Sequence, residues 1–167
     1  MNNCQKHGLL VIGYPGIGKS TVVKSSSAKI IDFESSLFYI NDKRQPDWYK
    51  VYAKQATELA KQGCVVLVSS HKTVRNELAK YIPNSNFDIV TIAPAYHLEK
   101  EWTSKLQDRY KADSTSKNFA AYMNAIEFYH ENITDMASDS RFSHIFINSM
   151  DYKLGEILRN LRLTFNF

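Results

Sequence analysis

The feature that most constrains this chain is the run Gly13-Tyr-Pro-Gly-Ile-Gly-Lys-Ser-Thr21, which matches the pattern G-x-x-x-x-G-K-[ST] at every fixed position. Glycines let a backbone turn so that successive N–H groups point at phosphate oxygens, and a following helix adds the positive end of its dipole. The apolar run Leu9–Ile12 precedes the motif directly, and a helix-compatible stretch at 20–27 follows it. This strand–loop–helix context is the one that phosphate binding requires.

The residue types of the motif predict that it binds ATP and Mg²⁺. Lys19 is expected to reach the β- and γ-phosphates, and the hydroxyl of Ser20 is expected to ligate Mg²⁺. A glycine-rich turn without a ligand is the alternative, but such a turn does not require Lys19 and Ser20 together. The residues expected to contact the nucleotide are Gly13, Gly16, Ile17, Gly18, Lys19, Ser20 and Thr21.

Apolar runs and helical spacings alternate along the chain, which predicts an α/β fold. Continuous apolar runs favour strands that are covered on both faces, and they occur at 8–13, 29–33, 64–69, 87–92 and 144–148. Between them lie stretches with helical spacing at 46–62, 72–81, 96–111, 117–136 and 151–163. Such alternation indicates a parallel sheet with right-handed crossovers. No linker interrupts the pattern, so residues 1–167 are expected to form a single domain.

Composition limits the classes of partner. The net charge is +4 and the basic residues are spread along the chain, whereas nucleic-acid-binding proteins concentrate them on one face. A small anionic molecule is therefore expected as the substrate, and nucleic acid is not. Cys4 and Cys64 make neither a disulfide framework nor a metal set. No apolar stretch is long enough to span a bilayer, and we expect a cytoplasmic protein that is a monomer or a homodimer.

Asp32 stands at the end of the second predicted strand, where ligands bind in open parallel sheets. It is expected to act as a base or to orient the acceptor, and to help hold Mg²⁺, because the third run ends in serine rather than in an acid. Glu34, Ser35 and Ser36 follow and are expected to bind the acceptor. An ordinary helix start is the alternative for this segment, since serine and aspartate also serve as N-caps.

Dispersed cations are candidates for contacts with phosphate. Arg44 follows the Asp32 segment, and His71 and Arg75 are spaced so that they share a helix face. Lys105 and Arg109 are spaced four apart in a charged stretch that is typical of a lid closing over phosphates. Solvated helix charges are the alternative for all of them.

Taken together in this order, the motif, Asp32, Arg75 and the Arg109 region resemble the small P-loop kinases, a group that includes nucleoside monophosphate kinases, adenylate kinase and shikimate kinase. The stretches Asp32-Phe-Glu-Ser-Ser and Val66-Leu-Val-Ser-Ser-His-Lys-Thr-Val-Arg75 are similar to small adenylate-kinase-like proteins of bacteria and phages. The resemblance implies a P-loop NTPase three-layer αβα sandwich with a five-stranded parallel sheet of order 2-3-1-4-5.

The resemblance also implies the functional regions of the chain. An acceptor-binding segment is expected at about 32–62, and a lid-like segment at about 96–118. Arg75 would contact the acceptor phosphate and Arg109 would come from the lid, both as catalytic residues beside Lys19 and Asp32. Asn148 would border the adenine.

Three functions are consistent with these residues. The first is ATP-dependent phosphoryl transfer to a small phosphate acceptor, with a (deoxy)nucleoside monophosphate expected. The second is transfer to a non-nucleotide metabolite or to a polynucleotide 5′-hydroxyl. The third is an ATP-binding regulator with little turnover, which the missing acid after the third run and the single lid arginine favour. Fold-level analogy does not choose among them.

Overall fold

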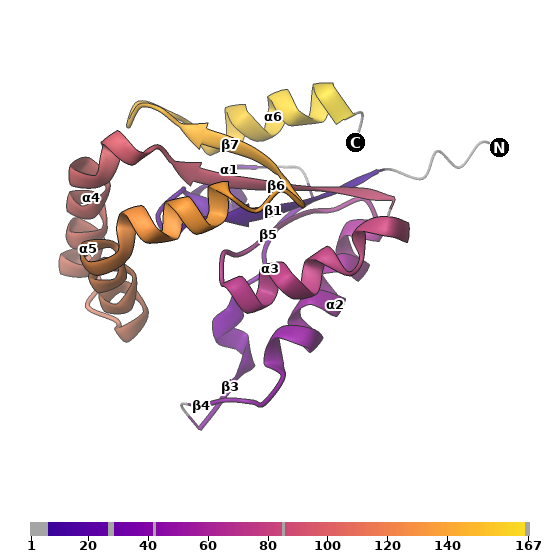
Figure 1. Ribbon diagram of the computed structural model, residues 1–167, viewed down its shortest axis with the longest axis horizontal. Coiled ribbons are helices and arrows are strands. Elements are labelled where there is room, and N and C mark those ends of the chain that lie inside the picture. Colours follow the sequence, from indigo (N-terminus) through magenta and orange to yellow (C-terminus); the bar gives the residue numbers. More distant parts are fainter. Residues whose placement is uncertain (1–6, 27–28, 42, 85, 166–167) are drawn as a thin grey trace.

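The computed structural model describes residues 7–26, 29–41, 43–84 and 86–165 of the chain, and five parallel strands form its central sheet (Figure 1). The strands lie in the order β2-β5-β1-β6-β7. Numbered among themselves along the chain, they have the order 2-3-1-4-5, which confirms the predicted fold class. Their bounds are β1 (Gly8–Gly13), β2 (Ile30–Asp32), β5 (Val65–Ser69), β6 (Phe87–Pro94) and β7 (Ser143–Ile147).

The central strand is buried along its whole length because it pairs on both sides and is covered on both faces. All six residues of β1 are buried, and its Leu10 lies in register with Val66 of β5 and Ile89 of β6. A strand in this position exposes no face to water, which explains why its sequence is a continuous apolar run. The strand carries the phosphate-binding motif at its carboxyl end.

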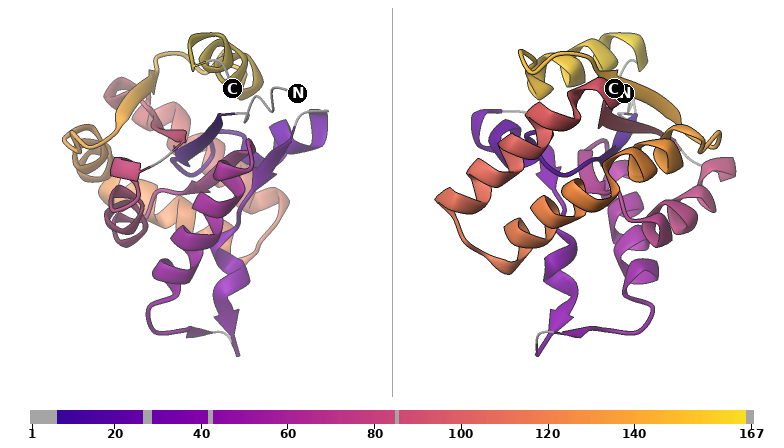
Figure 2. Two further views of the ribbon diagram at one scale, coloured as in Figure 1. Left: turned by 90° about the vertical axis from the view of Figure 1, so that its right-hand side faces the viewer. Right: turned by 60° about the vertical axis from the view of Figure 1, so that its left-hand side comes forward.

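Six helices of the described chain cover the sheet and form the outer layers. Figures 1 and 2 show α6 over one face, and α2 and α3 over the other. Each helix begins and ends within three residues of its predicted bounds, except that position 27 of the first lies outside the described residues. The bounds are α1 (Lys19–Ser25), α2 (Trp48–Lys61), α3 (Lys72–Ala79), α4 (Glu99–Ala112), α5 (Ser116–Ala137) and α6 (Leu154–Phe165).

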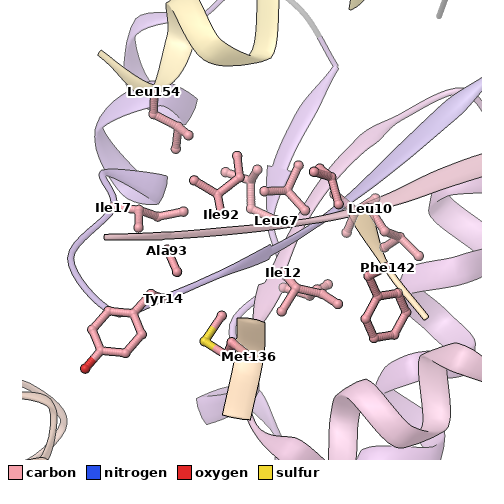
Figure 3. Close-up of a cluster of buried hydrophobic side chains, with 14 of the residues drawn as sticks. Leu10, Ile12, Tyr14, Ile17, Leu67, Ile92, Ala93, Met136, Phe142 and Leu154 are labelled. Atoms are coloured by element: carbon pink, nitrogen blue, oxygen red, sulfur yellow. The ribbon is translucent and has the colours of Figure 1, made fainter. Parts of the chain in front are cut away.

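Apolar side chains fill the space between the sheet and both helical layers (Figure 3). Leu154 of α6 lies on one side of the strands, and Met136 of α5 and Phe142 lie on the other. Cys64 is also buried, as expected for a small apolar side chain, whereas Cys4 lies outside the described residues. None of the described helices combines the length and apolar character needed to cross a membrane.

The sequence pattern did not predict the short elements between β2 and α2. They form what we call the arm, residues 35–41 and 43–44, at the bottom of Figure 1. The chain passes from β2 into the 3-10 turn η1 (Ser35–Phe38) and then into the hairpin of β3 (Tyr39–Ile40) and β4 (Lys43–Arg44). Two-residue strands carry no measurable periodicity, so this hairpin has no sequence signal of its own. The other 3-10 turns are η2 (Ile82–Asn84) and η3 (Tyr96–Leu98).

Helix α2 approaches the central strand very closely at Gly8. A Cβ placed on Gly8 would lie 1.8 Å from the carbonyl oxygen of Ala60, well inside van der Waals contact. Helix α2 ends one turn later, where Gly63 adopts a left-handed φ of 80°, as expected for glycine after a helix. Glycine at position 8 therefore fixes how near the helix packs against the sheet.

We expect the substitution Gly8→Ala to lower the free energy of unfolding by about 2 kcal/mol or more, because the added methyl group must displace helix backbone. The matched control is Gly155→Ala in α6, where the new Cβ would lie 3.5 Å from Val22, at ordinary contact distance. This control should change stability by less than about 1 kcal/mol. Urea denaturation of both variants measures the difference, and equal midpoints would contradict the packing argument.

Candidate functional site

The phosphate-binding loop joins β1 to α1 and depends on two glycines with positive φ. Gly16 and Gly18 have φ values of 90° and 98°, a left-handed region that side chains disfavour. Between them Ile17 turns inward and is 1% exposed, and Figure 3 shows it beside Leu154 of α6. The backbone of the loop thus faces the cavity while its apolar side chain joins the core.

Helix α4 packs directly against this loop. The indole Nε1 of Trp102 donates a hydrogen bond to the carbonyl oxygen of Pro15 at 2.8 Å. A Cβ on Gly16 would lie 3.1 Å from Leu106 and 3.2 Å from Trp102, so this glycine also permits the close approach. The helix that was expected to form part of a lid is therefore attached to the loop at its first turns.

Lys105 joins this attachment from the same helix. Its ammonium donates to the Tyr152 hydroxyl at 2.9 Å and lies 4.5 Å from the centre of the Trp102 ring. The Tyr152 ring stacks on Trp102 with centroids 5.8 Å apart, and its hydroxyl donates to the Gly16 carbonyl at 3.3 Å. Burial of the ammonium lowers the pKa of Lys105. Arg109, one turn further on, lines the cavity and is exposed.

The Lys19 ammonium folds back over the loop and donates to the Gly13 carbonyl oxygen at 3.3 Å. Burial lowers the pKa of Lys19, while the nearby carboxylates of Asp32 and Glu34 act in the opposite direction. Lys117 and Arg109 add a further lowering. Because charge interactions fall with distance, these four groups lie near the Lys19 ammonium.

Ser20 and Asp32 lie side by side although they come from different elements. The Ser20 hydroxyl donates to Asp32 Oδ2 at 3.0 Å. Burial is the main cause of a raised pKa for Asp32, and Lys19 opposes it. Adjacent ligands of an octahedral Mg²⁺ with bonds of about 2.1 Å are about 3 Å apart, and Mg²⁺ prefers oxygen. The spacing and chemistry of these two oxygens therefore fit a magnesium ion.

A cavity of about 1110 Å³ opens from the loop between the arm and helices α4 and α5. Most of the residues that sequence analysis selected lie on its wall. These are Gly13, Gly16, Ile17, Gly18, Lys19, Ser20, Thr21, Glu34, Ser35, Ser36, Arg44, His71, Arg75 and Arg109. Asp32 is joined to them through Ser20. The cavity therefore joins the residues expected to bind the nucleotide and those expected to bind the acceptor in one space.

Arg44 is the main cation on the arm side of the cavity. Its guanidinium carbon lies 4.2 Å from the centre of the Trp48 ring and 5.0 Å from that of Tyr39. Nη2 donates to Ser35 Oγ at 3.2 Å and lies 3.3 Å from His71 Nε2, while Nε is buried without a partner in the described structure. Two aromatic rings thus hold the Arg44 guanidinium in place. Among the described residues, no carboxylate forms an ion pair with it.

His71 lies next to Arg44 as a neutral imidazole. Desolvation, together with the smaller effects of the Arg44 and Lys19 charges, lowers the pKa of His71 to about 4. Its ring packs edge-on against Trp48 at 5.9 Å. A guanidinium only donates hydrogen bonds, so Nε2 accepts from Arg44 and the ring proton resides on Nδ1. His71 is therefore a neutral hydrogen-bonding group beside the cavity.

Arg75 reaches the cavity wall, but its charge is already paired. The side chain is 3% exposed and forms ion pairs with Asp139 at 2.8 Å and with Asp135. Its Nε donates to the carbonyl oxygen of Ser70 at 3.2 Å. Arg75 and His71 both line the cavity, but Arg75 pairs with the two aspartates whereas His71 contacts Arg44. Contact between Arg75 and an acceptor stays a prediction, and it requires the guanidinium to leave these partners.

Asn148 lies outside the cavity. It follows β7 and is exposed, and its carbonyl oxygen accepts a hydrogen bond from His97 Nε2 at 3.0 Å. The residues on the cavity wall do not include it. Its expected role beside the adenine stays a prediction without support from this arrangement.

Lys117 is a cavity residue that sequence reasoning missed. Its ammonium lies 2.5 Å from Glu34 Oε2, across the cavity from α5 to the segment after β2. Asn124, Asn132 and Asp135 of the same helix also line the wall. The polar residues of a long amphipathic helix normally face water, so only the path of α5 along the cavity distinguishes these side chains.

The imidazole of His71 should stay neutral well below pH 6, because burial and two cations disfavour its protonated form. An NMR titration should therefore place its midpoint near pH 4. Replacing the neighbouring charge in Arg44→Met should move the midpoint upward by about one unit. A midpoint at the ordinary value in the wild-type protein would contradict the described surroundings of the ring.

We expect Arg75→Met to lower the free energy of unfolding by about 3 kcal/mol, because it leaves the buried carboxylate of Asp139 without this partner. Lys72→Met provides the matched control. Lys72 pairs with the same Asp135 but is 68% exposed, so its loss should cost less than about 1 kcal/mol. Chemical denaturation measures both, and similar losses would contradict a structural role for Arg75.

The fold has counterparts among solved structures. One of them is a gluconokinase from Sinorhizobium meliloti 1021, which aligns with a TM-score of 0.54 over 97% of this chain and 93% of that chain, at 15% sequence identity. No protein-family model matches the sequence, and no curated protein matches it. At this identity the likeness concerns the fold, and it shows that the chain has the α/β fold of a P-loop kinase.

Proposed function

We propose that this protein transfers the terminal phosphoryl group of ATP to a small anionic acceptor. The observation that carries the proposal is the contact of Ser20 with Asp32 at 3.0 Å, beside Lys19 and at one cavity with the cationic arm. A nucleotide-binding regulator needs the loop and Lys19 but no second site facing them. A phosphotransferase needs both sites in one enclosed space.

The loop side of the cavity would hold ATP and Mg²⁺. Backbone N–H groups at 16–21 and the Lys19 ammonium are suited to the phosphates, and Ser20 and Asp32 would hold the metal ion. Bound there, Mg²⁺ supplies positive charge that offsets the negative charge of the phosphates. Arg109 and Lys117 add cations from the opposite wall, where charge develops on the transferred group.

The arm side would hold the acceptor. Arg44, His71, Ser35 and Ser36 offer hydrogen-bond donors and one positive charge to an anionic group. In the reaction an acceptor oxygen forms a bond to the γ-phosphorus as the bond from that phosphorus to the bridging oxygen of ADP breaks. Asp32 would accept the acceptor proton or orient the acceptor oxygen.

A non-nucleotide metabolite with one anionic group suits the arm best. Two carboxylates occupy Arg75, which leaves Arg44 as the cation on that wall without an ion pair among the described residues. One guanidinium matches a carboxylate, whereas a phosphate dianion is better met by several cations. One solved structure with the same fold is a gluconokinase, so the fold also serves an acceptor that is not a nucleotide.

A (deoxy)nucleoside monophosphate is the second candidate acceptor. The cavity of about 1110 Å³ exceeds the usual range for one small ligand, and it has room for two nucleotides. Arg75 would then have to exchange Asp135 or Asp139 for the acceptor phosphate. The two candidates therefore differ in whether Arg75 is needed for turnover or only for folding.

Production of ADP from ATP and Mg²⁺ should depend on one acceptor in a panel of hydroxy acids, sugar acids including gluconate, and ribo- and deoxynucleoside monophosphates. We expect Lys19→Ala to reduce turnover about 100-fold or more by removing a cation from the phosphates. Asp32→Asn should reduce it by a similar or larger factor. Arg44→Lys should mainly raise the KM for the acceptor, because the planar fork is lost.

Each outcome distinguishes the candidates. Turnover with a sugar acid or hydroxy acid supports the metabolite kinase, and turnover with a monophosphate supports the second candidate. ATP binding without acceptor-dependent ADP production across the panel would overturn both and favour a regulator.

A further inference from the structure

The ion pair between Glu34 and Lys117 joins two walls of the candidate site. The two residues are 83 positions apart in the chain, and both line the cavity that contains the phosphate-binding loop. Glu34 follows β2 and lies two residues from Asp32, whereas Lys117 belongs to the first turn of α5. The ammonium and the carboxylate, 51% and 30% exposed, are 2.5 Å apart. The pair therefore links the acceptor side of the cavity to its opposite wall.

Lys117 belongs to a small unit that we call the lid tip, residues 107–122. Gln107 Nε2 donates to the Tyr122 hydroxyl at 2.9 Å, and Tyr110 packs against Phe119 at 5.3 Å and Tyr122 at 6.4 Å. At the turn between the helices, Asn118 is buried and donates to the carbonyl oxygen of Asp113 at 2.8 Å. These contacts hold the end of α4 and the start of α5 together, so the lid tip forms one packed unit.

The lid tip is flanked by segments that are fixed to the core. On one side, Trp102 and Leu106 pack against the phosphate-binding loop. On the other, the Tyr129 hydroxyl donates to the Ala95 carbonyl at 2.8 Å. Just before Tyr129 the helix is interrupted at Phe128, whose φ of −135° and ψ of 21° are not helical. This kink separates the lid tip from the anchored part of α5 at Tyr129.

The electrostatic surroundings favour a second partner for Lys117. Lys117 is close enough to Lys19 and Asp32 to influence the pKa of each, and Arg109 of the lid tip influences Lys19 in the same way. A half-exposed ion pair is weak in water, while a terminal phosphate carries more charge than a carboxylate and accepts stronger hydrogen bonds from ammonium groups. Bound ATP would therefore compete with Glu34 for Lys117.

We propose that Lys117 is a nucleotide-sensing residue that leaves Glu34 for the terminal phosphate of ATP, and that its departure makes the Glu34 carboxylate available to the acceptor. This inference rests on the proposed function, because it requires ATP in the loop and an acceptor on the arm. In the free protein the ion pair occupies the acceptor-side carboxylate. ATP binding removes that restriction, so the nucleotide binds before the acceptor.

Calorimetric titration with Mg²⁺ and either a non-hydrolysable ATP analogue or ADP tests the exchange without any turnover. Lys117→Met should weaken binding of the triphosphate about tenfold and change ADP binding less than twofold, because ADP lacks the group that Lys117 contacts. Lys117→Arg should restore most of the affinity. The matched control is Lys111→Met, which removes the same charge from an exposed lid-tip residue that pairs only loosely with Asp108 at 4.0 Å.

A double-mutant cycle separates competition from simple repulsion of phosphate by Glu34. If Glu34 competes for Lys117, Glu34→Gln should tighten binding of the triphosphate about threefold in the wild-type background. It should have little effect in the Lys117→Met background. An equal effect in both backgrounds would show that Glu34 acts by repulsion alone, and it would overturn the exchange.

The remaining outcomes are also decisive. Triphosphate binding that is unchanged in Lys117→Met, or weakened equally in Lys111→Met, overturns the inference and leaves the proposed function intact. Failure of the wild-type protein to bind either nucleotide overturns the proposed function together with the inference. Thermal melting of each variant checks that it is folded, and the exposure of both lysines predicts little change.

Discussion

The arrangement of this molecule depends on the attachment of helix α4 to the phosphate-binding loop. A loop that presents backbone N–H groups to a ligand leaves its carbonyl groups facing the other way, and these also need partners. Here the Trp102 indole donates a hydrogen bond to the carbonyl oxygen of Pro15, and the Tyr152 hydroxyl donates one to the carbonyl oxygen of Gly16. The loop, the first turns of α4 and the start of α6 therefore form one hydrogen-bonded unit at the carboxyl end of β1, and the remaining walls of the cavity are built around it.

Much of the fold could be predicted because the apolar pattern of each segment matches how deeply that segment is buried in the structure. A strand such as β1, paired on both sides, has no polar face, and its apolar run and the motif after it identify the centre of the sheet. Helices α2 and α5 carried the expected spacing and ended where Gly63 and the turn before β7 lie. The hairpin of β3 and β4 was missed because two-residue strands carry no periodic pattern, and the contacts of its Arg44 with the Tyr39 and Trp48 rings cannot be read from the sequence.

The candidate site was predictable to the extent that position along a strand determines it. Asp32 was selected because it ends β2, and its side chain does meet Ser20. The cations were harder, since a sequence does not say which charges neutralise each other. In the sequence, Arg75 and Arg44 look equivalent. In the structure, Asp135 of α5 and Asp139 just after it form ion pairs with Arg75, whereas aromatic rings surround Arg44. The sequence pattern could not identify Lys117 as a site residue, because its contact with Glu34 depends on the path of α5.

The cluster around Arg75 has a consequence for how sequences of this fold can diverge. Arg75 of α3, Asp135 of α5, and Asp139 and Arg141 in the turn before β7 share their charges, and Arg141 also donates to Asn76. Loss of Arg75 or Asp139 leaves the other charged where water has little access, and the cost of an unpaired buried charge exceeds what most single substitutions impose. Substitutions at Arg75 and Asp139 therefore depend on each other. Relatives should keep the whole set or replace it together, so that Arg75 and Asp139 change as a pair across an alignment even though 64 residues separate them.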